Sequence, residues 1–214
     1  KVIEEFDIKE GQEECRGKLG LPRGKKIILY AGHLYQWKGA SVLLEAARKF
    51  LSLRDISRRE TIDNYLFIFV GGTAEDIAEF KKQAKNLDNV FVVGHRPHLE
   101  IPYWLRASDV LCLPNAGKEE ISRYWTSPMK MFEYMAAKRP IVASDLPSLR
   151  EILNENNSVL VEPDSPEKLP QGIKKVLNDP QLAQRISSQA FKEVQNYSWQ
   201  RRAKKILEPL DPRN

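Results

Sequence analysis

Cysteines are scarce in this chain of 214 residues, and no long apolar run occurs. Its two cysteines are Cys15 and Cys112, and Cys112 lies in the apolar stretch 110–113. We therefore expect a small buried side chain at Cys112 rather than a disulfide or a nucleophile. No apolar run approaches the roughly 18 residues that a membrane-spanning helix needs. The sequence begins at Lys1 without a signal peptide, and we expect a segment of a longer chain.

Several functional motifs are also missing. The three histidines, at positions 33, 95 and 98, lack metal-ligand spacing with cysteine or acidic residues, so no metal site is predicted. The sequence has no Gly-x-Gly-x-x-Gly fingerprint, no Walker-type phosphate loop and no nucleophile elbow. Basic residues are not interleaved with aromatics as in nucleic-acid motifs, and we expect no nucleic-acid partner.

A positive charge is what the composition does offer. The formal net charge is +5, which favours anionic ligands such as nucleotide diphosphates or anionic lipid headgroups. Basic clusters at 54–59 and 201–205 are each typical of solvated surface, although basic helices could also bring a longer protein to an anionic membrane.

Strand-length apolar runs alternate with amphipathic helical stretches. We expect strands over residues 26–31, 65–70, 90–93, 109–113, 140–143 and 158–161. We expect helices near residues 42–50, 76–85, 101–107, 128–136, 149–153, 166–177, 180–195 and 199–207. This alternation predicts an α/β fold, a Rossmann-like doubly wound parallel sheet covered on both faces. Such sheets bind ligands at the carboxyl ends of their strands, where Gly32, Gly71, Gly94 and Pro114 fall.

The segment 126–144 carries the strongest local signal. Ser127 is a good N-cap and Pro128 suits the first helical position, so the amides of Met129 and Lys130 begin a helix without partners. Such a helix start binds anions, and Lys130 adds positive charge to it. Glu133 lies one turn further on the same side, where a carboxylate suits ribose hydroxyls.

A simpler interpretation of this segment is also open. Most Ser-Pro helix starts bind nothing, and Met129, Phe132 and Ala136 have the spacing of core residues. Only the convergence of several loops at one sheet edge favours a ligand site.

In four stretches the chain resembles the C-terminal, donor-binding half of a GT-B glycosyltransferase of group 1, or family 4. They are residues 28–39, 66–72, 92–114 and 126–153, and their order along the chain matches that family. The resemblance implies that Lys38 binds the diphosphate of a UDP- or GDP-sugar, that the helix start with Ser127, Met129 and Lys130 holds phosphate, and that Glu133 binds ribose. It also implies that Gly32 and His33 lie near the donor, and that Gly94 and Arg96 lie near the base.

Two positions depart from the family pattern. His33 stands where the family has arginine, which removes a charged, bidentate group from the diphosphate site. Trp125 stands eight residues before Glu133, where the family often has a second glutamate. Some relatives with Ser-Pro-x-Lys at this helix also lack that glutamate, and the contact to the sugar hydroxyls stays unassigned.

The implied activity is that of a retaining, metal-independent glycosyltransferase that moves a sugar from a nucleoside diphosphate to an acceptor hydroxyl. Lys38 and Lys130 are the predicted catalytic residues, because fixed positive charge stabilises the leaving diphosphate. No cofactor is expected besides the nucleotide-sugar substrate. Two alternatives remain: a non-catalytic nucleotide-sugar-binding or interaction module, and a GT-B sugar-nucleotide epimerase.

We predict three parts of the chain. Residues 1–24 form a peripheral lead-in, 25–197 the nucleotide-sugar-binding α/β domain, and 198–214 a C-terminal helix that packs toward an N-terminal domain outside this sequence. That domain would bring the acceptor, a glycan or a lipid-linked glycan, so this chain alone should be inactive. We expect a cytoplasmic protein in polysaccharide or glycoconjugate biosynthesis, with peripheral attachment to the inner face of a membrane as a further expectation.

Overall fold

Six parallel strands form one sheet in the computed structural model, which describes residues 2–52, 64–127 and 129–198. The strand order is β3-β2-β1-β4-β5-β6. The strands are β1 (Lys26–Ala31), β2 (Tyr65–Val70), β3 (Val90–Gly94), β4 (Val110–Leu113), β5 (Ile141–Ser144) and β6 (Val159–Val161). The predicted doubly wound α/β fold is therefore confirmed, and each of these strands lies within two residues of its expected bounds.

Ten α-helices connect and cover these strands in the described part of the chain. They are α1 (Val2–Phe6), α2 (Gln12–Leu19), α3 (Ala40–Ser52), α4 (Ala74–Gln83), α5 (Ile101–Ala107), α6 (Glu120–Tyr124), α7 (Met129–Ala136), α8 (Pro147–Arg150), α9 (Lys168–Asn178) and α10 (Pro180–Val194). Three short 3-10 helices accompany them: η1 (Gln36–Lys38), η3 (His98–Glu100) and η4 (Gln195–Tyr197).

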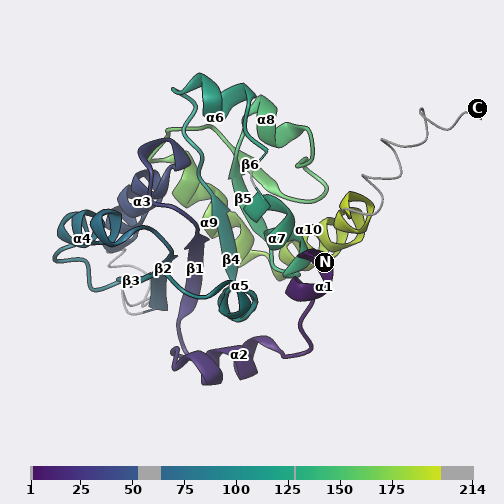
Figure 1. Cartoon of the computed structure of the whole chain (residues 1–214), viewed down its shortest axis with the longest axis horizontal. Coiled ribbons are helices and arrows are strands. Elements are labelled where there is room, and N and C mark those ends of the chain that lie inside the picture. Colours follow the sequence, from purple (N-terminus) through teal and green to yellow (C-terminus); the bar gives the residue numbers. More distant parts are fainter. Residues whose placement is uncertain (1, 53–63, 128, 199–214) are drawn as a thin grey trace, which may run out of the picture.

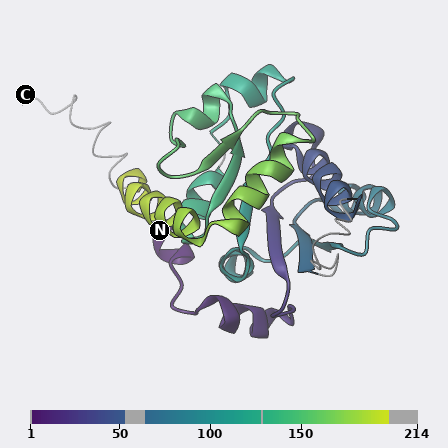
Figure 2. The same cartoon turned by 180° about the vertical axis from the view of Figure 1, so that it is seen from behind.

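The strands are apolar throughout because both faces of the sheet are covered. In β1, Ile27 and Leu29 point into one core and Ile28 and Tyr30 into the other, all of them fully buried. The first core contains side chains of α1, α2, α5, α7 and α8, and the second contains those of α3, α4 and α9. Figure 1 shows the first layer in front of the sheet, and Figure 2 shows α3 and α9 on the reverse side.

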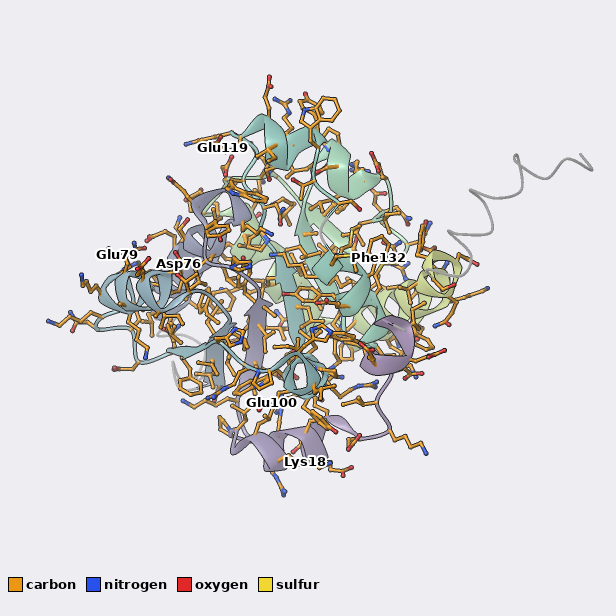
Figure 3. All side chains as sticks on the ribbon, in the orientation of Figure 1. Lys18, Asp76, Glu79, Glu100, Glu119 and Phe132 are labelled. Carbon is orange, nitrogen blue, oxygen red and sulfur yellow. The ribbon has the colours of Figure 1, made fainter. Side chains whose placement is uncertain are left out.

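Strand β1 defines the two ends of the sheet. Its arrow points to the upper edge in Figure 1, where α6 and α8 lie, and α2 lies at the opposite end. In Figure 3 the labelled Glu119 marks the carboxyl edge and Lys18 the amino edge. The switch point of the strand order falls between β1 and β4, and the crevice outside such a point is where open α/β sheets bind ligands.

The lead-in packs closely against the domain. Phe6 of α1 and Cys15 of α2 are fully buried in the first core, and α1 contacts α7 while α2 contacts α5. The boundary near residue 24 stays a prediction, and the predicted C-terminal helix at 199–207 lies outside the described residues. Cys112 is buried and free, as expected, and burial raises the pKa of its thiol.

Helices α3, α4 and α8 each begin two residues earlier than expected, and α4 and α8 do so for local reasons. Helix α4 starts at Ala74 because Thr73 caps it: the Thr73 hydroxyl accepts from the Asp76 amide, and the Asp76 carboxylate accepts from the Thr73 amide. Helix α8 starts at Pro147, a residue suited to the first turn, rather than at Leu149. Helices α1, α2 and α6 were not predicted: α1 and α6 are only five residues long, and α2 is mostly polar, so none of them shows a clear apolar period.

Candidate functional site

Glycines join the loops that follow the first three strands. The Gly32 amide donates to Val70 O at 2.8 Å, and the Gly71 amide donates to Gly94 O at 2.8 Å. Gly32 and Gly71 have φ angles of 138° and 116°, a region that side-chain-bearing residues avoid. A Cβ on Gly71 would lie 2.4 Å from Gly32 O. The loops after β1, β2 and β3 therefore form one continuous floor at the carboxyl edge.

Lys38 reaches this edge on a short 3-10 turn. Gly39 ends the turn with φ of 75°, and a Cβ there would lie only 1.6 Å from Pro114 O. The Ala116 amide donates to Trp37 O at 3.0 Å, which ties the turn to the segment after β4. Lys38 is half-buried, its Nζ lies 4.7 Å from the centroid of a Trp37 ring, and burial lowers its pKa.

Lys130 is the most unusual group at this edge. Its side chain is buried, and among the described residues its Nζ has no hydrogen-bond partner. The amine lies 4.1 Å from the centroid of the Tyr30 ring, and a Cβ on Gly32 would lie 3.8 Å from it. The pKa of Lys130 is lowered to about 7, mainly by burial and in addition by the nearby charge of Lys38, while Glu133 opposes both effects.

Lys130 therefore differs from the fully charged residue that the sequence suggested. Near neutral pH the amine is balanced between its charged and neutral forms, because no hydrogen-bond acceptor among the described residues replaces its lost hydration and Glu133 compensates only in part. A bound anion would supply that compensation.

Two tyrosines hold Lys130 in place. The Tyr134 hydroxyl accepts from the Ala31 amide at 2.7 Å, which fixes α7 against the end of β1. The Tyr30 hydroxyl donates to the carbonyl of His33, so the ring under the amine is anchored to the following loop. Sequence reasoning missed both tyrosines, since each one reads as ordinary core.

Glu133 lies beside a residue that sequence reasoning did not select. Burial raises the pKa of the Glu133 carboxyl, while the nearby charges of His98 and Lys130 lower it. His98 belongs to η3, and its Nε2 also lies 3.7 Å from a carboxylate oxygen of Glu5. Although His98 lies near Arg96 in the sequence, no spacing signal connects it with Glu133.

The remaining predicted residues occupy the rim of the site. His33 is exposed and stacks on Tyr35 with ring centroids 4.9 Å apart. Ser127 and Arg96 are exposed, and Gly94 accepts the Gly71 hydrogen bond. The expected cap of α7 involves Pro128, which lies outside the described residues.

Met129 is not a core residue, in contrast to the simpler interpretation of this helix. It is 46% exposed, and Met131, Tyr134 and Met135 form the buried face of the helix instead. Phe132 is half-buried and Ala136 is fully buried, as that interpretation expected. Trp125 is 79% exposed, and Glu119 and Glu120 are exposed at the rim near α6.

The described residues contain no group of three or more His, Cys, Asp or Glu side chains that could hold a metal ion. Within the same ranges, none of the helices combines the length and apolar character needed to cross a bilayer.

Comparisons with known proteins agree with this geometry. The family model described as glycosyl transferases group 1 matches residues 11–193. A D-inositol 3-phosphate glycosyltransferase 1 of Catenulispora acidiphila is 25% identical over 205 residues, covering 92% of this chain and 46% of that protein. The chain thus spans about half the length of the curated relatives it matches.

Solved structures share the fold. The C-terminal domain of a glycosyl transferase group 1 family protein (LpcC) from Francisella tularensis superposes with a TM-score of 0.71 at 22% identity, covering 91% of this chain and 96% of that one. Anabaena Alr3699/HepE, solved in complex with UDP, gives a TM-score of 0.78 at 20% identity, covering 97% of this chain and 54% of that one. The fold agrees with these structures, and the family model matched over residues 11–193 shows that the chain belongs to the glycosyltransferase group 1 family.

Proposed function

We propose that this chain binds the nucleoside diphosphate of a nucleotide sugar at its carboxyl edge, as the donor half of a glycosyltransferase. The observation that carries the proposal is the buried Lys130 amine, which lacks an acceptor within the described residues. It lies at the switch point over Gly32 and close enough to Lys38 for the two charges to repel. A diphosphate would relieve that repulsion and give both amines a partner.

The same two lysines would serve the chemistry. When the bond between the sugar and the diphosphate breaks, negative charge grows on the leaving oxygen. The acceptor hydroxyl forms the new glycosidic bond, and its proton passes to the leaving diphosphate. Fixed positive groups in a site shielded from water stabilise that charge more than water does. We assign this catalytic role to Lys38 and Lys130, in a reaction that retains the anomeric configuration and proceeds without a metal.

Glu133 would bind the ribose hydroxyls of the donor. It sits one turn after Lys130 on the same helix, and its partly buried carboxylate can accept two hydrogen bonds from a diol. Arg96, with Gly94, would lie on the side of the base.

The acceptor would be bound by a second domain of the longer protein. GT-B active sites lie between two domains, and the relatives that this chain matches are about twice its length. We therefore expect donor binding without efficient transfer by this chain alone. Robust transfer by the isolated chain would contradict that expectation.

Ligand binding can be tested by thermal shift with UDP, GDP, ADP and the corresponding sugars. A ligand that binds only the folded state raises its stability, by about 2.7 kcal/mol at 100 times its Kd. We expect one nucleotide family to raise the melting temperature, and the Lys130→Met variant to lose that shift.

Lys138→Met is the matched control. Lys138 also lies over an aromatic ring, Phe191, but it is paired with Asp7. If no nucleotide raises the melting temperature of the wild-type chain, the proposal is wrong. If the nucleotide still binds to the Lys130→Met variant, the binding site lies elsewhere and Lys130 has no part in it. Turnover by the longer protein then separates a transferase from a non-catalytic binding module.

A further inference from the structure

Asn115 follows β4 and is fully buried, with 0% of its surface exposed. Among residues 2–52, 64–127 and 129–198, neither its Oδ1 nor its Nδ2 has a hydrogen-bond partner. A buried carboxamide without partners is rare in folded proteins, and each such group calls for an explanation. This one lies directly after a central strand, beside the switch point of the sheet.

The other buried asparagines of the described chain make different use of their amides. Asn157 donates to Ile152 O and to the Glu193 carboxylate, and its Oδ1 accepts from the Asn154 amide. Asn89 donates to Ala47 O at 3.0 Å, which leaves only its oxygen unmatched. Both hold two backbone segments together, whereas the Asn115 side chain holds none.

The backbone around Asn115 is nevertheless fixed from two sides. The Ala116 amide donates to Trp37 O at 3.0 Å, in the turn that carries Lys38. The Gly117 amide donates to the Asp164 carboxylate at 2.9 Å, in the loop after β6. Gly39 adds a close approach, since a Cβ there would lie 3.2 Å from the Asn115 amide nitrogen. The backbone of Asn115 therefore has a defined position beside the predicted diphosphate site. The Asn115 side chain makes no hydrogen bond that maintains this position.

We propose that the Asn115 carboxamide binds a pair of adjacent hydroxyls on the sugar of the donor. An amide presents one acceptor and one donor group side by side, and two neighbouring sugar hydroxyls present the complementary pair. Lys38 and Lys130 serve the diphosphate and Glu133 serves the ribose, which leaves the sugar for Asn115. This assignment rests on the function proposed above and names the residue that distinguishes a nucleotide sugar from its bare nucleotide.

Calorimetric titration of the whole chain with UDP and UDP-glucose, and with GDP and GDP-mannose, tests the assignment. For the wild-type chain we expect the sugar to tighten binding of one pair by roughly tenfold, the gain from two buried neutral hydrogen bonds. In Asn115→Ala the nucleotide sugar should bind only as tightly as its bare nucleotide, whose own affinity should stay within about twofold of wild type.

Two further variants separate binding from folding. Asn115→Leu keeps the volume of the side chain and removes both polar atoms, so it should fold and lose the sugar's contribution. Asn89→Ala removes a buried amide far from the carboxyl edge, so it should lower the melting temperature and keep the full contribution of the sugar.

Equal weakening of the bare nucleotide and the nucleotide sugar in Asn115→Ala and Asn115→Leu would show a structural role and overturn the assignment. A wild-type chain that gains nothing from the sugar, or variants that keep the full gain, would overturn it too. A wild-type chain that binds neither UDP nor GDP contradicts the proposed function itself, which is a distinguishable result.

Discussion

Two buried cations at opposite edges of the sheet contrast sharply. At the amino edge, Arg16 is 3% exposed and fully partnered: its guanidinium donates to Ala107 O at 2.8 Å, to Arg23 O at 3.1 Å and to the Asp109 carboxylate at 2.6 Å. At the carboxyl edge, Lys130 is 8% exposed and, within the described chain, has only a ring beneath its amine.

The difference separates stability from function. Asp109 also accepts from the Ile27 amide at 2.7 Å, so the Arg16 network joins α2, β1 and the start of β4 into one unit. The hydrogen bonds of this network offset the desolvation free energy of the buried charges. Within the described chain the Lys130 amine is buried without such hydrogen bonds, and the proposed diphosphate would supply them.

The largest predicted effect breaks the partnered edge. Arg16→Ala removes the closest partner of the Asp109 carboxylate, which is 17% exposed and keeps the Ile27 amide and the more distant Lys26. Removing one member of a buried pair costs up to about 3 to 5 kcal/mol of unfolding free energy. Urea denaturation should show the loss as a lower midpoint with little change in slope. Under native conditions the affinity for the preferred nucleotide should not change. A midpoint equal to that of wild type would show that the network contributes nothing to stability.

Lys130→Met should act in the opposite direction on stability. The substitution replaces a poorly hydrated amine by an apolar chain of similar length, and relief of such burial is often neutral to stabilising. The attraction of the amine to the Tyr30 ring, about 1 to 2 kcal/mol, opposes that gain. We expect an increase of roughly 1 kcal/mol in the free energy of unfolding, measured in urea at pH 7. A loss of several kcal/mol would mean that Lys130 is a structural residue like Arg16.

The pH dependence of stability provides a third comparison. The pKa of Lys130 is about 7 in the folded chain against 10.5 for the free side chain, so between these values the unfolded chain binds more protons. Stability should therefore rise with pH across this window, by up to about 1.4 kcal/mol per pH unit from this group. Below pH 7 both states are protonated and the contribution is constant.

The groups around this amine are Lys38, Glu133 and Tyr30, of which Lys38 keeps its own lowered pKa after substitution. Subtracting the pH profile of Lys130→Met from that of the wild-type chain isolates the Lys130 contribution. Identical slopes in the two proteins between pH 7 and pH 10 would show that the amine is well solvated.

The sequence was sufficient for the fold and for choosing residues that the fold brings together. Alternating apolar runs predicted the six strands, and Gly32 and Pro114 follow strand ends at the edge where the candidate site lies. Periodicity and strand-end position are local properties, and so is the helix pattern that selected Lys130 and Glu133. Family resemblance added Lys38, which the structure brings near Lys130.

The electrostatic state of the site was not predictable in the same way. Lys130 is buried because α7 packs against Tyr30 and Gly32, which are far away in the sequence. No local sequence pattern predicts these tertiary contacts. Asn115 could have been noticed, because it follows Pro114 at a predicted strand end, but its lack of partners is a tertiary fact. His98 was passed over for the same reason: its proximity to Glu133 arises from the fold.

The smallest predicted effect concerns His33, at the exposed rim of the same edge. His33→Arg adds a permanent charge and two parallel donors, and the planar guanidinium can stack on Tyr35 as the imidazole does. The backbone should be undisturbed, because the Tyr30 hydroxyl bonds to the carbonyl of residue 33 and not to its side chain. We expect nucleotide diphosphate to bind about threefold more tightly, since an exposed charge gains well under 1 kcal/mol.

Titration at low and at moderate salt should show the gain in affinity shrinking as salt rises, because screening acts on exposed charges first. Lys130 is shielded from solvent, so the contribution lost in Lys130→Met should depend far less on salt. An unchanged affinity in His33→Arg at both salt concentrations would mean that the side chain at position 33 points away from the diphosphate, and that the buried amines alone define its site.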